Sequence, residues 1–168
     1  MSRPTSFSTK LAVVSQKLTR GALIVSALGL VIMTMIVGWQ VFARYVLNAS
    51  PAWSESAAML LMLYYIMLAA AVGVHEGFHL GLKIVLDSVS PEARRGLEVV
   101  NNSLILLFGL AMLINGVRLA QFTVDHVIPT LNISRASAYL PFAAAGLLIS
   151  IFAFEKIVLI ITQPELRE

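Results

Sequence analysis

The sequence contains no cysteine. Disulfide bonds, cysteine-ligated zinc, iron–sulfur clusters and thiol nucleophiles are therefore all excluded. Charge is also scarce: charged residues make up 12% of the chain, against about 25% in an ordinary soluble domain. Hydrophobic residues make up 58%, and the mean hydropathy is +0.86. An apolar excess of this size indicates a lipid environment, because the outside of a soluble fold must still be wetted.

Four long stretches lack charge and histidine, which matters because an ionisable group at the bilayer centre costs about 2.5–3.5 kcal/mol. Each can form a helix across the hydrocarbon core, which takes about 17–25 residues. A single strand would leave its backbone groups unpaired in lipid, so helix is required. We predict an all-α membrane protein whose single domain, residues 21–161, crosses the bilayer four times. The predicted spans are about 21–43, 56–74, 97–118 and 136–156.

The basic residues predict the orientation. Of the twelve Lys and Arg residues, only Arg44, Arg118 and Arg135 lie on one side of the four spans. The positive-inside rule then places both termini, including the tail at 162–168, in the cytoplasm. Because the basic residues lie at membrane edges and not on one exposed face, the net charge of +3 does not indicate a nucleic-acid partner.

Residues 1–20 are predicted to form an amphipathic helix on the membrane surface, with apolar residues at helical spacing and basic residues on the other flanks. This pattern favours binding to anionic lipid, and a frayed terminus is the alternative. A second, short interfacial helix is predicted in the cytoplasmic loop, where Leu82, Val85, Leu86 and Val89 share a face. The predicted membrane-surface anchors are Phe7, Lys10, Leu11, Lys17, Arg20 and, among the aromatic residues of the outer interface, Trp39.

Residues 75–79 read His-Glu-Gly-Phe-His and satisfy H-E-x-x-H, the pattern of a zinc metalloprotease. An intramembrane zinc metalloprotease is therefore one alternative function. Against it, the motif falls where the second span ends, and Gly77 weakens a helix. Catalytic zinc also needs a third protein ligand, yet His126 lies on the opposite side in this topology. The other interpretation is a set of polar residues that end a span.

A membrane-anchor subunit of a respiratory complex is a further alternative, since four-helix bundles can hold haem between histidines. No histidine falls inside a predicted span, which disfavours haem. Solute transport by this chain alone is also disfavoured. The span interiors offer little more than Gln40, Asn101, Asn102 and Asn115 as polar groups for a solute path.

Small residues recur within the spans and let helix backbones approach closely. Such faces serve either the packing of the bundle itself or docking to a larger membrane protein. At the outer edge, Arg44 ends one span and Glu55 opens the next, so we expect these two residues to pair. The small-residue faces are Ala69 with Gly73 and Gly77, Ala143 to Gly146, and Thr34 with Gly38.

Residues 41–48 read Val-Phe-Ala-Arg-Tyr-Val-Leu-Asn, and Trp-Ser-Glu follows at 53–55. Together with the stretches at 76–82, 133–141 and 154–156, this hairpin resembles the DctQ family, the small membrane subunit of tripartite ATP-independent periplasmic (TRAP) transporters. The hairpin at 41–55 is the most specific part, and the resemblance covers roughly residues 20–158. The chain departs from the family pattern at His75, Lys83, Ser56, which replaces an acidic residue, and Tyr64 or Tyr65, which replaces a tryptophan.

The resemblance implies a non-catalytic scaffold subunit in the bacterial inner membrane, part of a sodium-coupled importer of an organic acid or similar solute. It implies a large multi-span TRAP membrane subunit, a periplasmic substrate-binding protein and membrane lipids as partners. No cofactor is expected in this chain, because sodium is expected on the large subunit. The candidate structural and subunit-interface residues are Arg44, Tyr45, Trp53, Ser54, Glu55, Ala69, Gly73, Gly77 and His79.

Overall fold

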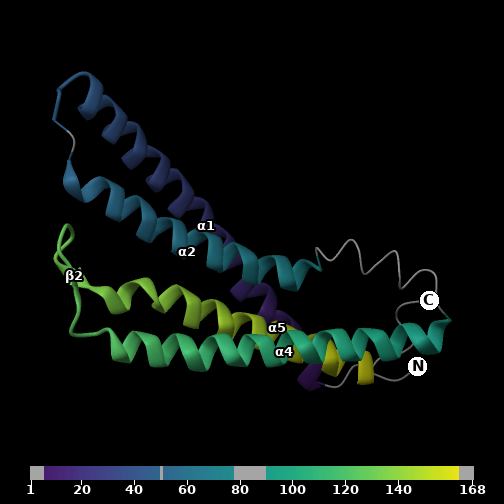
Figure 1. Ribbon diagram of the computed structural model, residues 1–168. Helices are drawn as coiled ribbons and strands as arrows, with labels where there is room; N and C mark the ends of the chain where they lie inside the picture. The colour runs from purple at the N-terminus through teal and green to yellow at the C-terminus, as the bar shows by residue number, and fades with distance from the viewer. Residues whose placement is uncertain (1–5, 50, 78–89, 163–168) are drawn as a thin grey trace.

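The structure is a computed structural model that describes residues 6–49, 51–77 and 90–162. Four long helices dominate it, and each contains a segment long and apolar enough to cross a membrane. This confirms the prediction of four helices that are able to span a membrane. The helices are α1 (Ser6–Tyr45), α2 (Ala52–Glu76), α4 (Pro91–Phe122) and α5 (Leu140–Thr162), shown in Figure 1. The predicted interfacial helix at 82–89 lies outside the described residues.

α1 is a single unbroken helix of 40 residues, where the sequence predicts two separate elements that meet at residue 20. At a rise of about 1.5 Å per residue it is about 60 Å long, roughly twice the thickness of the hydrocarbon core. The continuity has a packing reason. Ser15, Thr19, Ala22 and Ser26 are buried at helical spacing, so one face of α1 stays against the bundle on both sides of residue 20.

The four helices form two antiparallel hairpins, α1 with α2 and α4 with α5. α5 is the most buried helix, because it packs against α4, α2 and the first part of α1. We call the end of the bundle with the α1–α2 and α4–α5 connections the loop end. The opposite end, where α1 and α4 begin and α2 and α5 finish, is the terminal end. At the loop end the two hairpins diverge (Figure 1).

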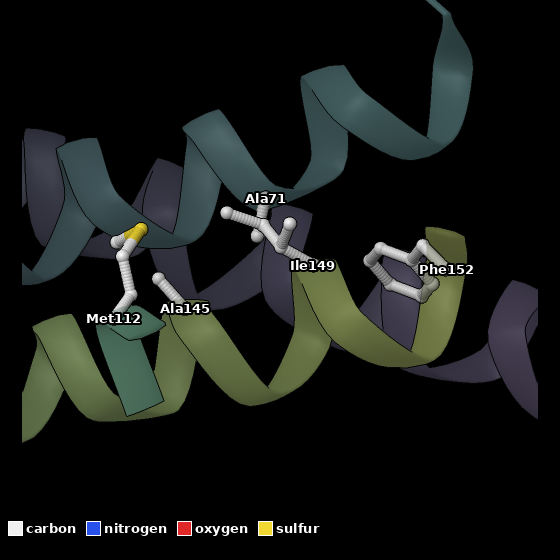
Figure 2. Close-up of a cluster of buried hydrophobic side chains, with 5 residues drawn as sticks. All are labelled: Ala71, Met112, Ala145, Ile149 and Phe152. Atoms are coloured by element: carbon white, nitrogen blue, oxygen red, sulfur yellow. The ribbon is translucent and has the colours of Figure 1, made fainter. Parts of the chain in front are cut away.

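The core lies between α2, α4 and α5 and consists of Ala71, Met112, Ala145, Ile149 and Phe152 (Figure 2). Leu18 of α1 packs against this cluster, so all four helices contribute to it. Lipid tails are as apolar as these side chains, so burial in lipid alone does not bring the helices together. Close contact between side chains and backbones must supply the attraction instead.

α4 and α5 approach each other at backbone contact. A Cβ atom placed on Gly146 of α5 would lie 2.5 Å from the Leu113 nitrogen and 2.7 Å from the Gly109 oxygen. A Cβ on Gly116 would lie 2.8 Å from the Ala143 nitrogen. Only glycine fits at these crossings. The small-residue face at 143–146 therefore serves the packing of the bundle itself, one of the two interpretations that the sequence left open.

The connection between α4 and α5 folds into a small motif at the loop end. Strands β1 (Val127–Ile128) and β2 (Ile133–Ser134) pair antiparallel, and the 3₁₀ helix η1 (Arg135–Ala138) leads into α5. The Ser134 side chain caps η1 by accepting a hydrogen bond from the backbone N–H of Ala136. Two hydrogen bonds join this connection to α2. The Thr130 hydroxyl donates to the Ser56 oxygen at 2.6 Å, and the Tyr64 hydroxyl donates to the Ser137 carbonyl oxygen at 2.9 Å.

Candidate functional site

The predicted interface residues of the first hairpin lie together at the loop end. Tyr45 is 77% exposed, and Trp39 and Trp53 also have exposed side chains. The Trp39 ring lies 5.9 Å from that of Phe42, measured between centroids. Exposed aromatic rings at one end of a spanning hairpin are typical of a membrane–water interface. They also form a surface that a neighbouring membrane protein can cover.

Ser54, another of the predicted interface residues, is fully buried. Its hydroxyl donates to the Pro51 carbonyl oxygen at 2.8 Å and so stabilises the first turn of α2. Glu55, the next residue, is exposed in that turn. Its negative charge lies near the positive end of the helix dipole and so stabilises the helix. The ion pairs between described residues are His75–Glu155 and Arg94–Glu98. The expected pair of Arg44 with Glu55 is not among them.

The three residues of the predicted small-residue face on α2 have different surroundings. Ala69 is exposed, and Gly73 is half-buried. Gly77 ends the helix with a left-handed backbone conformation, φ 73°, and its N–H donates to the Gly73 carbonyl oxygen at 3.1 Å. Glycine adopts this conformation without the penalty that a Cβ atom brings. On α1, Thr34 is exposed and Gly38 faces open space, so this face is free for contact with lipid or a partner.

His75 and Glu76, the described polar residues of the H-E-x-x-H motif, have different surroundings in the structure. Glu76 is exposed, and His79 lies outside the described residues. His75 turns into the bundle, where its Nε2 lies 3.8 Å from Oε2 of Glu155 and its ring packs against Phe152 with centroids 4.7 Å apart. Across the part of the chain that the structure describes, no group of three metal-ligating side chains occurs. The geometry of the described part thus gives the zinc interpretation no support.

A polar cluster at the terminal end joins α2 to α5. The Lys156 ammonium of α5 donates to the Val74 carbonyl oxygen of α2 at 2.6 Å. A positive charge at the carboxyl end of a helix interacts favourably with its dipole and satisfies a carbonyl that the helix leaves unpaired. One residue earlier, Glu155 is buried opposite His75. We refer to His75, Val74, Glu155 and Lys156 as the terminal polar cluster.

The sequence analysis did not identify this cluster, although a signal was present. His75 directly follows the second predicted span, while Glu155 and Lys156 end the fourth, so all three are expected at similar depth on the same side. The hydrogen bonds of Ser56 and Tyr64 were also missed. Ser56 was noted only as an expected departure from a family pattern, and Tyr64 only as one of two alternatives with Tyr65. Nothing in the sequence indicated their partners, which lie 74 and 73 residues further along the chain.

Comparison with known families decides between the hypotheses. The family model described as tripartite ATP-independent periplasmic transporters, DctQ component, matches residues 33–163. The chain belongs to the DctQ family. A DctQ component is the small permease subunit of a TRAP transporter and not an enzyme, and such subunits work with a large membrane subunit and a periplasmic binding protein. The metalloprotease and respiratory-anchor alternatives receive no support from this membership.

A curated relative agrees with the family assignment. This DctQ-family chain is 25% identical over 122 residues to the sialic acid TRAP transporter small permease protein SiaQ of Vibrio cholerae serotype O1. The matched region covers 73% of this chain and 70% of the relative. Four apolar helices together with this family indicate a multi-pass membrane protein.

Proposed function

We propose that this chain is the scaffold subunit of a sodium-coupled, binding-protein-dependent TRAP importer in the bacterial inner membrane. In this role it packs against the large membrane subunit and helps to hold that subunit in place while the large subunit moves solute and sodium. The match of the DctQ family to residues 33–163 carries the proposal. The sodium site is expected on the large subunit, so this chain needs no cofactor.

The bonding of polar side chains within the spans supports a scaffold role. The side-chain amides of Asn102 and Asn115 donate to the carbonyl oxygens of Glu98 and Ala111, each four residues earlier in the same helix. The Ser150 hydroxyl donates to Gly146 in the same way. These local bonds satisfy polar groups in an apolar environment. Groups that line a solute path would instead face one another across helices.

The backbone contact between α4 and α5 also favours a static bundle. Interlocked glycine and alanine positions leave no room for one helix to slide past the other without a clash of backbone atoms. A scaffold that braces a moving partner needs such rigidity. The exposed apolar surface of α1 and the loop-end aromatic residues then remain for lipid and for the large subunit.

The proposed solute is an organic acid or a similar compound captured by the periplasmic binding protein. Sialic acid, which the Vibrio cholerae relative is named for, is itself a carboxylic acid and supports this class. The residues that select the solute belong to the partner chains. We therefore expect substitutions in this chain to change the amount of assembled transporter and not its choice of solute.

The decisive experiment measures solute uptake and complex assembly with and without this chain. Deletion is expected to abolish uptake while the affinity of the binding protein for its solute stays unchanged. Co-expression with the large subunit is expected to give a complex that co-purifies on a tag placed on either chain. Uptake into liposomes that contain this chain alone would contradict the proposal.

The proposed orientation, with both termini in the cytoplasm, has a test that the sequence makes simple. Because the chain contains no cysteine, single-cysteine variants carry no background label. A membrane-impermeant maleimide is expected to label Asp125→Cys, in the connection at the loop end, on intact spheroplasts. Thr162→Cys, at the end of α5, is expected to react only after lysis. The reverse pattern would show that the orientation is wrong.

A further inference from the structure

Lys17 and Arg20, two of the predicted membrane-surface anchors, lie on the outer side of α1. The buried face of this helix runs through Ser15, Thr19 and Ser26. Each residue turns a helix by about 100°, so Lys17 and Arg20 lie on the side away from this face, and both are exposed. Neither forms an ion pair or a side-chain hydrogen bond with any residue that the structure describes. Two positive charges at the terminal end are therefore available to a ligand from outside the chain.

α1 itself offers these cations no negative charge. The first acidic residue of the sequence is Glu55, beyond the end of the helix. Glu76, the exposed acidic residue at the end of α2, is ion-paired with neither Lys17 nor Arg20. A basic side chain attracts an anion most strongly where no acidic residue competes for it. The ligand that suits this surface is thus negatively charged.

The same side of α1 continues as an apolar surface. Ile24, Leu28, Val31 and Met35 follow Arg20 at helical spacing, and each has half or more of its surface exposed. From the first to the last of them the helix rises by about 17 Å, close to the thickness of one hydrocarbon leaflet, about 15 Å. The surface therefore combines cations at one end with an apolar track as long as one leaflet.

We propose that this surface binds one anionic phospholipid. The surface, which we call the α1 lipid face, consists of Lys17, Arg20, Ile24, Leu28, Val31 and Met35. Lys17 and Arg20 are neighbours on the helix, three residues apart, so both reach a single phosphate group. The apolar residues then contact an acyl chain of the same lipid. The proposal concerns the chain in its membrane and does not rest on the transporter role.

The depth of the two cations agrees with a lipid phosphate. Arg20 directly precedes the charge-free stretch at 21–43, and Lys17 lies about 4.5 Å further along the helix axis. The polar interfacial layer of a bilayer is about 5–7 Å thick on each side, so both cations fall within it. Because α1 is about twice as long as the hydrocarbon core is thick, a phosphate held here fixes which part of the helix lies in the core.

The experiment measures the affinity of the full chain in detergent for added lipid, by native mass spectrometry. Phosphatidylglycerol is the anionic probe, and phosphatidylcholine, which has no net charge, is its counterpart. Lys17→Gln and Arg20→Gln are each expected to lower the affinity for phosphatidylglycerol about fivefold and to leave that for phosphatidylcholine unchanged. Arg20→Lys keeps the charge and is expected to keep most of the affinity. Arg118→Gln, which removes an exposed charge at the loop end, is the matched control and is expected to bind as the wild type does.

Two further measurements separate a phospholipid from other ligands. Glycerol phosphate carries the anionic group without acyl chains and is expected not to displace the lipid. Lys17→Gln and Arg20→Gln are expected to keep the wild-type melting temperature in phosphatidylcholine, because both positions are exposed. The inference is overturned if these variants bind phosphatidylglycerol as tightly as the wild type, or if glycerol phosphate competes as well as the lipid. Variants that keep their lipid affinity but lose the large subunit on purification would show that the surface contacts protein instead.

Discussion

The Tyr64 hydroxyl of α2 donates a hydrogen bond to the Ser137 carbonyl oxygen of η1 at 2.9 Å. Together with the bond from Thr130 to Ser56, it ties the α1–α2 hairpin to the connection between α4 and α5. These two bonds join the hairpins at the end of the bundle where they diverge.

Tyr64→Phe is expected to destabilise the chain by about 1 kcal/mol, because the Ser137 carbonyl loses its donor in a partly buried place. For a chain of this size that corresponds to a fall of about 2–4 °C in melting temperature. Tyr65→Phe is the matched control, because the Tyr65 hydroxyl makes no hydrogen bond within the described part of the chain. An equal fall for both variants would mean that the Tyr64 bond contributes nothing specific.

Gly146→Ala is expected to destabilise the chain by about 1–3 kcal/mol, the usual range for overpacking. The added methyl would meet the backbone of Leu113 and Gly109, which cannot move aside as a flexible side chain can. Gly38→Ala is the control, since a Cβ there meets nothing within 4 Å. That variant is expected to be neutral or slightly stabilising. Thermal unfolding in detergent measures both, and a neutral Gly146→Ala would contradict the close α4–α5 contact.

Gly77→Ala is expected to cost about 1–2 kcal/mol, because a left-handed conformation brings the Cβ atom too close to the following carbonyl oxygen. Gly77→Asn should be milder, since asparagine tolerates this conformation. Comparison of the two melting temperatures separates the backbone requirement from the loss of a small side chain. If both variants were equally destabilised, crowding near Lys156 and not the backbone angle would be the cause.

Arg44→Ala and Glu55→Ala are each expected to reduce the yield of complex with the large subunit more than they change substrate preference. Both residues belong to the exposed loop-end surface of the first hairpin. The measurement is the ratio of large to small subunit after affinity purification, alongside uptake of several solutes. Arg118→Ala, an exposed basic residue of α4, is the control. A changed set of transported solutes with normal complex yield would show that these residues act on selectivity instead.

The sequence alone determined which segments enter the membrane. The apolar stretches bounded by Arg44, Glu55, His75 and Arg118 became helices that can span a bilayer, because backbone groups in lipid must bond within their own segment. The motifs at 41–48 and 53–55 also sufficed to predict the DctQ family, which the family comparison confirmed. That α1 continues unbroken through residue 20 could not be predicted, since surface amphipathicity and burial against the bundle produce a similar pattern of residues.

Only the tertiary structure decided which helix faces meet. Gly146 against Gly109, Tyr64 against Ser137, and His75 against Glu155 join residues that lie far apart along the chain. Hydropathy cannot select such partners, because lipid is as apolar as the side chains it surrounds. The selection depends on the fit of backbone to backbone and of donor to acceptor, and these appear only when the helices are placed side by side.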